Sequence, residues 1–142
     1  MLVSIAHQAI ADFTTTVAGL GLPAHLARAV VALTTPSPMR DLANQLNCDR
    51  SYITSLADQL EQRGLITRVA GKDRRVKLLA LTEEGLRVRD EISAAVAERN
   101  MILRRLSASD RKTLAPLLEK LLDGSDTAGS SHGMCVADSE EL

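Results

Sequence analysis

The chain has 142 residues, 45% of them hydrophobic, and a formal net charge of −1 at pH 7. This length predicts one domain with its own core, and with one Phe, one Tyr and no Trp that core must be aliphatic. No run approaches the roughly 20 apolar residues of a membrane-spanning helix, and the first residues lack the basic start of a signal peptide. We therefore expect a cytoplasmic protein.

Two helices are predicted in the first part of the chain. The first covers residues 2–18 and is broken by Gly19 and Gly21. The second covers residues 23–33, and its apolar residues recur at the three/four spacing that places them on one face of a helix. These core candidates are Leu26, Ala29, Val30 and Leu33.

A helix–turn–helix pattern follows. Ser37 precedes Pro38, and a serine hydroxyl caps free amide groups while proline tolerates the first helical position, so one helix is predicted to begin there. The next covers residues 50–63, with Asp49 or Ser51 as its cap and a glycine at its end. Each helix has one apolar stripe, formed by Leu42, Ala43 and Leu46 in the first and by Ile53, Leu56, Ala57 and Leu60 in the second.

The other face of the second helix is small, polar and rich in hydrogen-bond donors. Short side chains let a helix backbone come close to a major groove, and longer ones reach the base edges there. The alternative interpretation is an ordinary solvated helix face. The residues predicted to contact DNA from this helix are Arg50, Ser51, Thr54, Ser55, Asp58 and Gln59.

A hairpin with a charged tip comes next. Its tip cations Lys72, Arg74 and Arg75 fit phosphate contact or insertion into a narrow minor groove. Asp73 is predicted to support the tip by orienting an arginine as a bidentate partner. A merely solvated hairpin also needs charge, so this prediction depends on the helix beside it. The predicted strands are residues 65–70 and 76–81, both rich in β-branched and aliphatic residues.

Two further helices are predicted. Thr82 caps a long helix from residue 83 to about residue 106, and Ser107 with Asp110 resembles a capping box that starts the last helix. The last helix contains Pro116, which should kink it, and more leucine than one small core needs. The alternative is an ordinary core helix. The leucines are Leu114, Leu117, Leu118, Leu121 and Leu122.

Residues 124–142 are rich in Gly, Ser, Thr and Asp and are predicted to form a flexible acidic tail. The spacing of His132 and Cys135 permits metal binding, but two ligands in such a tail make a poor zinc site. No phosphate-binding loop or nucleophile elbow occurs, and the three histidines and two cysteines form no convincing catalytic set. We therefore predict no metal, no cofactor and no enzymatic activity.

The net charge looks wrong for a DNA-binding protein until it is divided along the chain. Residues 38–90 and 91–122 each carry a net charge of +2, whereas residues 123–142 carry −5. The last segment alone makes the chain acidic, and a dimer would double the positive surface. The distribution of charge is therefore compatible with DNA binding of moderate affinity.

Several motifs in the middle of the chain are specific in combination. They are Leu42-Ala43 with Leu46, Asp49-Arg50-Ser51, Leu60-Glu61-Gln62-Arg63-Gly64-Leu65-Ile66-Thr67-Arg68, Asp73-Arg74-Arg75 and Leu81-Thr82-Glu83-Glu84-Gly85. In these motifs, and in the order of helices over roughly residues 1–123, the chain resembles the MarR family of winged-helix transcriptional regulators.

The resemblance implies a mainly α (α+β) fold, a winged helix–turn–helix with a two-stranded wing and long flanking dimerisation helices. The DNA-binding lobe would be residues 38–82, and the dimerisation helices would lie in residues 1–37 and 83–123. The resemblance also implies a homodimer on double-stranded DNA with an inverted-repeat operator. The helix from Arg50 would lie in the major groove, and Arg75 would be the wing residue nearest the minor groove.

Members of this family sense oxidants through thiols, or small molecules in a cleft between the lobe and the dimer helices. By this resemblance Cys48 is a candidate redox switch, and the alternative is a small apolar residue packed in the turn. A disulfide between Cys48 and Cys135 is not expected in a reducing cytoplasm. No effector is named, because each residue that could line a cleft is more easily explained as a surface or core residue. These residues are His7, Phe13, His25 and Arg28.

The sequence thus predicts a sequence-specific DNA-binding transcriptional regulator. We expect a repressor that binds a palindromic operator as a homodimer and is released by a small molecule or an oxidant. The alternative is a winged-helix protein-interaction module without specific DNA binding. Such a module would not need Arg50 and the three tip cations, so DNA binding is the preferred interpretation.

Overall fold

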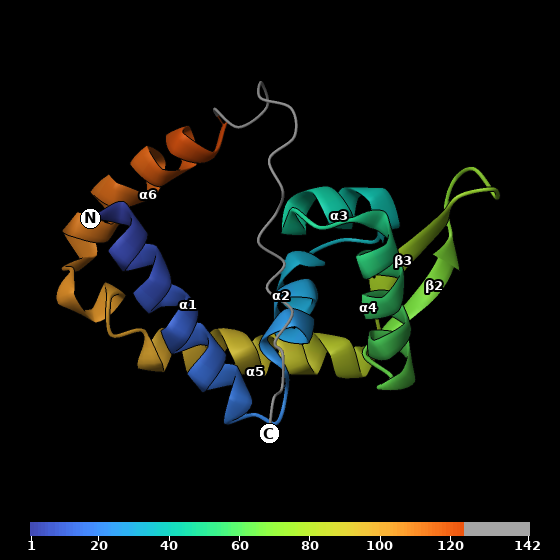
Figure 1. Cartoon of the computed structure of the whole chain (residues 1–142), viewed down its shortest axis with the longest axis horizontal. Helices are drawn as coiled ribbons and strands as arrows, with labels where there is room; N and C mark the ends of the chain where they lie inside the picture. Colours follow the sequence, from blue (N-terminus) through green and yellow to red (C-terminus); the bar gives the residue numbers. More distant parts are fainter. Residues whose placement is uncertain (124–142) are drawn as a thin grey trace.

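The computed structural model describes residues 1–123, which form a mainly helical fold with a small antiparallel sheet (Figure 1). The elements are α1 (Leu2–Ala18), α2 (Ala24–Ala32), β1 (Ser37–Pro38), α3 (Met39–Leu46), α4 (Arg50–Gln62), β2 (Ile66–Ala70), β3 (Lys77–Leu81), α5 (Glu83–Arg99), the 3₁₀ turn η1 (Leu103–Arg105) and α6 (Ala108–Asp123). Helices α2, α3 and α4 pack beside the sheet, and α5 leads from the sheet to the end of the molecule where α1 and α6 lie. The predicted winged-helix arrangement is confirmed.

The core lies between α2, α3, α4 and the sheet, and it is aliphatic as predicted. The apolar stripes of all three helices face inward, and burying one such large side chain contributes about 1.5–3 kcal/mol. Every stripe residue predicted from the helical period is buried, namely Leu26, Ala29, Val30, Leu33, Leu42, Ala43, Leu46, Ile53, Leu56, Ala57 and Leu60.

The sheet has three strands in the order β1-β3-β2, one more than the predicted hairpin. Ser37 and Pro38 pair with Leu79 and Leu78 of β3. The predicted cap at Ser37 is wrong, because Pro38 is extended (φ −61°, ψ 150°) and the Ser37 hydroxyl donates to the carbonyl oxygen of Thr35. An edge strand tolerates proline, since its missing N–H can face away from the sheet.

The turn between α3 and α4 depends on Asn47, which adopts the left-handed conformation (φ 53°) that asparagine enters more readily than most residues. Asp49 takes the predicted cap position of α4, although its carboxylate makes no capping bond, and Ser51 lies inside the helix. Cys48 packs against the core from this turn. The turn therefore holds α4 at the angle at which its apolar stripe meets the core.

Thr82 joins the wing to α5 and caps that helix, as predicted. Its hydroxyl donates to the carbonyl oxygen of Gly64 at 2.6 Å and accepts from the N–H of Gly85 at 3.0 Å. The Thr82 N–H also donates to the carbonyl oxygen of Leu65 at 3.0 Å. These bonds attach the first turn of α5 to the segment that follows α4.

The helix α5 ends at Arg99 and is therefore shorter than predicted. Asn100 leaves the helix (ψ 87°), and its side-chain oxygen accepts from the N–H of Leu103 at 3.0 Å, which starts η1. The predicted capping box is confirmed: the Asp110 carboxylate accepts from the N–H of Ser107, and the Ser107 hydroxyl accepts from the N–H of Asp110. The hydrogen bonds from Ser107 lower the pKa of Asp110.

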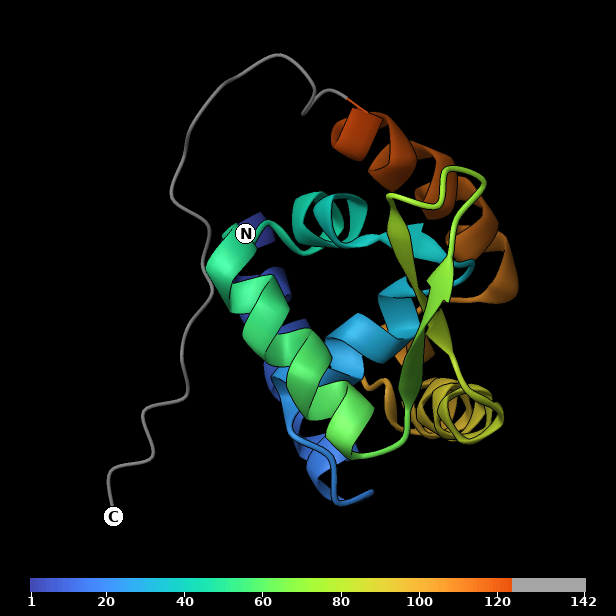
Figure 2. The same cartoon turned by 90° about the vertical axis from the view of Figure 1, so that its right-hand side faces the viewer.

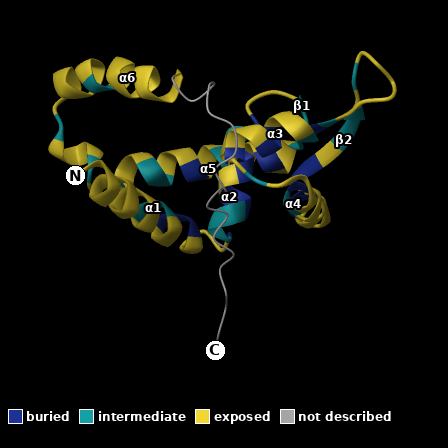
Figure 3. Cartoon of the chain, turned by 45° about the horizontal axis from the view of Figure 1, so that its top comes forward, coloured by how far each residue is buried: buried dark blue, intermediate teal, exposed yellow. Residues whose placement is uncertain are grey.

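Helices α1 and α6 leave most of their apolar side chains exposed (Figure 3). In α1 only Thr16 and Val17 are buried, and α6, which runs through Pro116 as one helix, has no buried residue. The alternative of α6 as a core helix of a single subunit is therefore wrong. The predicted acidic tail lies outside the described residues. Within residues 1–123, no helix has the length and hydropathy needed to cross a bilayer.

Candidate nucleic-acid interface and adjoining pocket

One face of the molecule carries both α4 and the hairpin of β2 and β3 (Figure 2). The apolar stripe of α4 faces the core, so its polar side turns outward. The hairpin lies beside α4 and projects beyond the core (Figure 1). All the α4 residues predicted to contact DNA are exposed, namely Arg50, Ser51, Thr54, Ser55, Asp58 and Gln59.

Short side chains occupy the outer side of α4 near its N-terminal end. The Thr54 hydroxyl donates to the carbonyl oxygen of Arg50 at 3.1 Å, and the Gln59 amide donates to the Ser55 hydroxyl at 3.5 Å. Because these groups add little bulk, the helix backbone can come close to a groove. Arg50 stands at the first position of the helix and takes part in none of the ion pairs formed within residues 1–123.

The wing tip carries three exposed cations. Asp73 does not orient an arginine side chain, as predicted, but accepts a hydrogen bond from the backbone N–H of Arg75 at 3.0 Å and so supports the turn itself. Lys72, Arg74 and Arg75 are absent from the ion pairs of the described part of the chain. Cations that no neighbouring acid compensates, at the end of a projecting hairpin, attract phosphate groups.

Asp58 differs from its neighbours on α4, because its carboxylate already has a cationic partner. A guanidinium nitrogen of Arg68, in β2, lies 2.5 Å from Asp58 Oδ1, and Arg68 Nε lies 3.7 Å from Glu61 Oε2. Helical and strand periodicity contain no signal for this pair, since it joins two elements whose relative placement the core decides. The pair links α4 directly to the hairpin.

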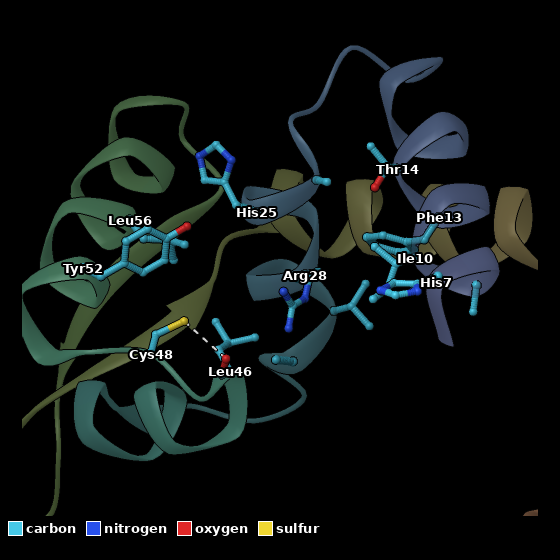
Figure 4. A pocket seen from close by; sticks show the side chains of 14 residues that line it. His7, Ile10, Phe13, Thr14, His25, Arg28, Leu46, Cys48, Tyr52 and Leu56 are labelled. Carbon is cyan, nitrogen blue, oxygen red and sulfur yellow. Dashed lines mark hydrogen bonds between the residues drawn. The ribbon is translucent and has the colours of Figure 1, made fainter. Parts of the chain in front are cut away.

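A pocket of about 610 Å³ lies between α1, α2 and the α3–α4 region (Figure 4). All four residues named as candidates for an effector cleft line it: His7, Phe13, His25 and Arg28. Most of the other lining residues are apolar. Among the described residues that line the pocket there is no carboxylate, and Arg28 is the only arginine or lysine. A large apolar pocket with a few polar groups is the usual form of a small-molecule site.

The helix α4 forms one wall of this pocket. Figure 4 shows Tyr52 and Leu56 of α4 across from His7 and Phe13 of α1, with Arg28 of α2 between the two sides. The sequence analysis did not assign Tyr52 to a cleft, although the chain's single tyrosine lies beside residues predicted to contact DNA. An occupant of the pocket would therefore touch the helix that carries the predicted base contacts.

Cys48 also lines the pocket, and its Sγ lies 3.2 Å from the carbonyl oxygen of Leu46. The apolar packing expected as the alternative to a redox role is present. Oxidation of Cys48 as a switch stays a prediction. The pairing of Cys48 with Cys135, like the spacing of His132 and Cys135, involves positions outside the described residues.

Comparison with known proteins gives matches to transcriptional regulators. A family model described as MarR family matches residues 34–77. A protein of Thauera aromatica, assigned as a transcriptional regulatory protein for the hcr operon, is 38% identical over 82 residues, covering 56% of this chain and 49% of that protein. The chain thus spans about half the length of this curated relative.

Two solved structures share most of the fold. A probable transcriptional regulator from Pseudomonas aeruginosa is 30% identical with a TM-score of 0.64, over 85% of this chain and 96% of that one. CouR from Rhodococcus jostii RHA1, solved bound to p-coumaroyl-CoA, is 26% identical with a TM-score of 0.75, over 92% of each chain.

Proposed function

Because the chain belongs to the MarR family of transcriptional regulators, we propose that it is a sequence-specific DNA-binding regulator that acts as a homodimer. The observation that carries this proposal is that the polar side of α4 and the three tip cations lie on one face. In this proposal α4 enters a major groove, where Arg50, Thr54 and Ser55 reach base edges or phosphates. The wing places Arg75 against the neighbouring minor groove.

The exposed apolar side chains of α1 and α6 support dimerisation. Leu117, Leu118 and Leu121 lie on one side of α6 by helical spacing, and Leu2 and Ile5 are exposed in α1. An apolar surface of this kind is stable in water only when another surface covers it. A second copy of the chain is the proposed cover, and a two-fold dimer would bind half-sites spaced by about one helical turn, roughly 10 base pairs.

The pocket supports control by a small molecule. Its apolar walls suit an apolar ligand, and Arg28 suits an anionic or strongly polar group on that ligand. The binding of p-coumaroyl-CoA by CouR makes this thioester, and the corresponding free acid, reasonable first probes. Because Tyr52 and Leu56 belong both to the pocket wall and to α4, occupancy would displace α4 and release DNA, as in a repressor.

The DNA-binding proposal is tested by selecting bound duplexes from a random pool at low ionic strength. Enrichment of a sequence with two-fold symmetry is the expected result, since each copy of a dimer would read one half-site. Absence of any enriched sequence would contradict the proposal and favour the protein-interaction module.

Replacing Arg75 with alanine should weaken binding to the selected duplex and lower the slope of log affinity against log salt by about one unit, because one phosphate contact per subunit is lost. Fluorescence anisotropy over a salt titration measures both quantities. The matched control is Arg104→Ala, which removes an exposed cation in η1, away from the proposed interface. Equal slopes for the wild type and Arg75→Ala would refute the proposed role of the wing.

Replacing Arg28 with alanine should weaken binding of the p-coumaroyl probes roughly tenfold, the usual cost of losing a charged hydrogen bond. Calorimetric titration of the protein without DNA measures this effect. The control is Arg40→Ala, which removes an exposed arginine of α3 that does not line the pocket. If both variants bind the probes as the wild type does, Arg28 does not select the ligand.

A further inference from the structure

We propose that Arg68 is a positioning residue that sets the direction of the wing relative to α4, through its ion pairs with Asp58 and Glu61. This inference rests on the proposed DNA binding. It gives Asp58 a different role from the base contact predicted from the helix pattern: Asp58 holds the wing, and the wing carries the contact.

The geometry of the three side chains supports this role. Asp58 and Glu61 lie three positions apart and therefore share one side of α4. The guanidinium of Arg68 reaches both, at 2.5 Å to Asp58 Oδ1 and 3.7 Å to Glu61 Oε2. Arg68 Nε is buried and makes no hydrogen bond, so the longer contact is a charge interaction only and Asp58 is the main partner.

The position of Arg68 along the hairpin explains why this contact matters. Below it, Ile66 and Leu79 are buried and hold the base of the hairpin in the core. Beyond it, no residue from 69 to 77 is buried. An isolated two-stranded ribbon is only marginally stable in water, so the direction of the outer half must be set at its base. Within residues 1–123, the side-chain ion pairs between α4 and the hairpin all come from Arg68.

Stability is not the main consequence of these ion pairs. Asp58 and Glu61 are about half exposed, and exposed ion pairs contribute little to folding. Near DNA, however, the pairs have two effects. They keep the tip cations in line with α4, and they compensate two carboxylates that would otherwise repel phosphate groups from the same face.

The test is a set of double-mutant cycles measured on the selected duplex by anisotropy at several salt concentrations. Arg75→Ala should cost roughly fivefold in affinity in the wild-type background and less than about twofold in the Arg68→Ala background, because a misdirected wing no longer brings Arg75 to the DNA. The change in salt slope caused by Arg75→Ala should disappear in the same background. Additive effects of the two substitutions would overturn the inference.

Further variants separate positioning from simple loss of charge or of stability. The charge swap Asp58→Arg with Arg68→Asp should recover most of the dependence on Arg75, whereas either single change should abolish it. Arg68→Lys should recover only part, since an ammonium group cannot make the forked contact of a guanidinium. A lower urea midpoint for Arg68→Ala with an unchanged contribution of Arg75 would show a merely structural role. If the wild type binds no duplex at all, the proposed function itself fails.

Discussion

Replacing Gly85 with alanine is expected to destabilise the fold by at least about 3 kcal/mol, because the new methyl group has no space. A Cβ atom at this position would lie 2.0 Å from the carbonyl oxygen of Leu65 and 3.1 Å from Leu81 Cδ2. The first of these atoms belongs to the backbone and cannot rotate away as a flexible side chain can.

Movement of the backbone would not relieve this clash cheaply. The carbonyl oxygen of Leu65 accepts the N–H of Thr82, and the Thr82 hydroxyl connects Gly64 to Gly85. A shift of α5 that makes room for the methyl group would break these bonds and withdraw Ile92 from the core. A buried hydrogen-bonding group left without a partner costs about 1–3 kcal/mol by itself.

Urea denaturation followed by circular dichroism measures the effect. The matched control is Gly19→Ala at the end of α1, where the backbone is right-handed helical and the nearest atom to a Cβ lies at 3.3 Å. That control should change the free energy of unfolding by no more than about 1 kcal/mol. A Gly85→Ala protein that unfolds at the wild-type urea concentration would show that α5 does not pack against Leu65 in solution.

Replacing Leu121 with aspartate is expected to separate the proposed dimer into single subunits and to weaken operator binding by roughly 100-fold, because each subunit then binds one half-site alone. Leu121 is 65% exposed in the single chain, so the change removes no core contact. At an apolar interface between subunits, by contrast, an unpaired carboxylate loses its hydration without compensation.

Sedimentation velocity and anisotropy with the selected duplex measure the two effects. The control Ser109→Asp adds the same charge to α6 on the side away from the leucines, given about 100° per residue. It should leave both the sedimentation coefficient and the affinity near wild type. If Leu121→Asp sediments as the wild type does, α6 is not part of the subunit interface.

The helices and the core were predictable because each depends on local periodicity. The stripes of α2, α3 and α4 are buried as predicted, and Thr82 and the Ser107–Asp110 pair cap their helices because capping involves residues within one turn. The errors are at element ends. The two-residue strand β1 is too short to have a period, and α5 stops early because of one bond between Asn100 and Leu103.

The sites divide in a similar way. The sequence by itself determined which residues of α4 and of the wing tip are exposed and polar, because amphipathic spacing and turn residues decide that locally. Only the tertiary structure decided that Arg68 meets Asp58 and that Tyr52 faces Phe13 across one pocket. Such pairs join elements distant in sequence, and their distances depend on how the whole core packs. The partners of a side chain therefore cannot be derived from its own helix or strand.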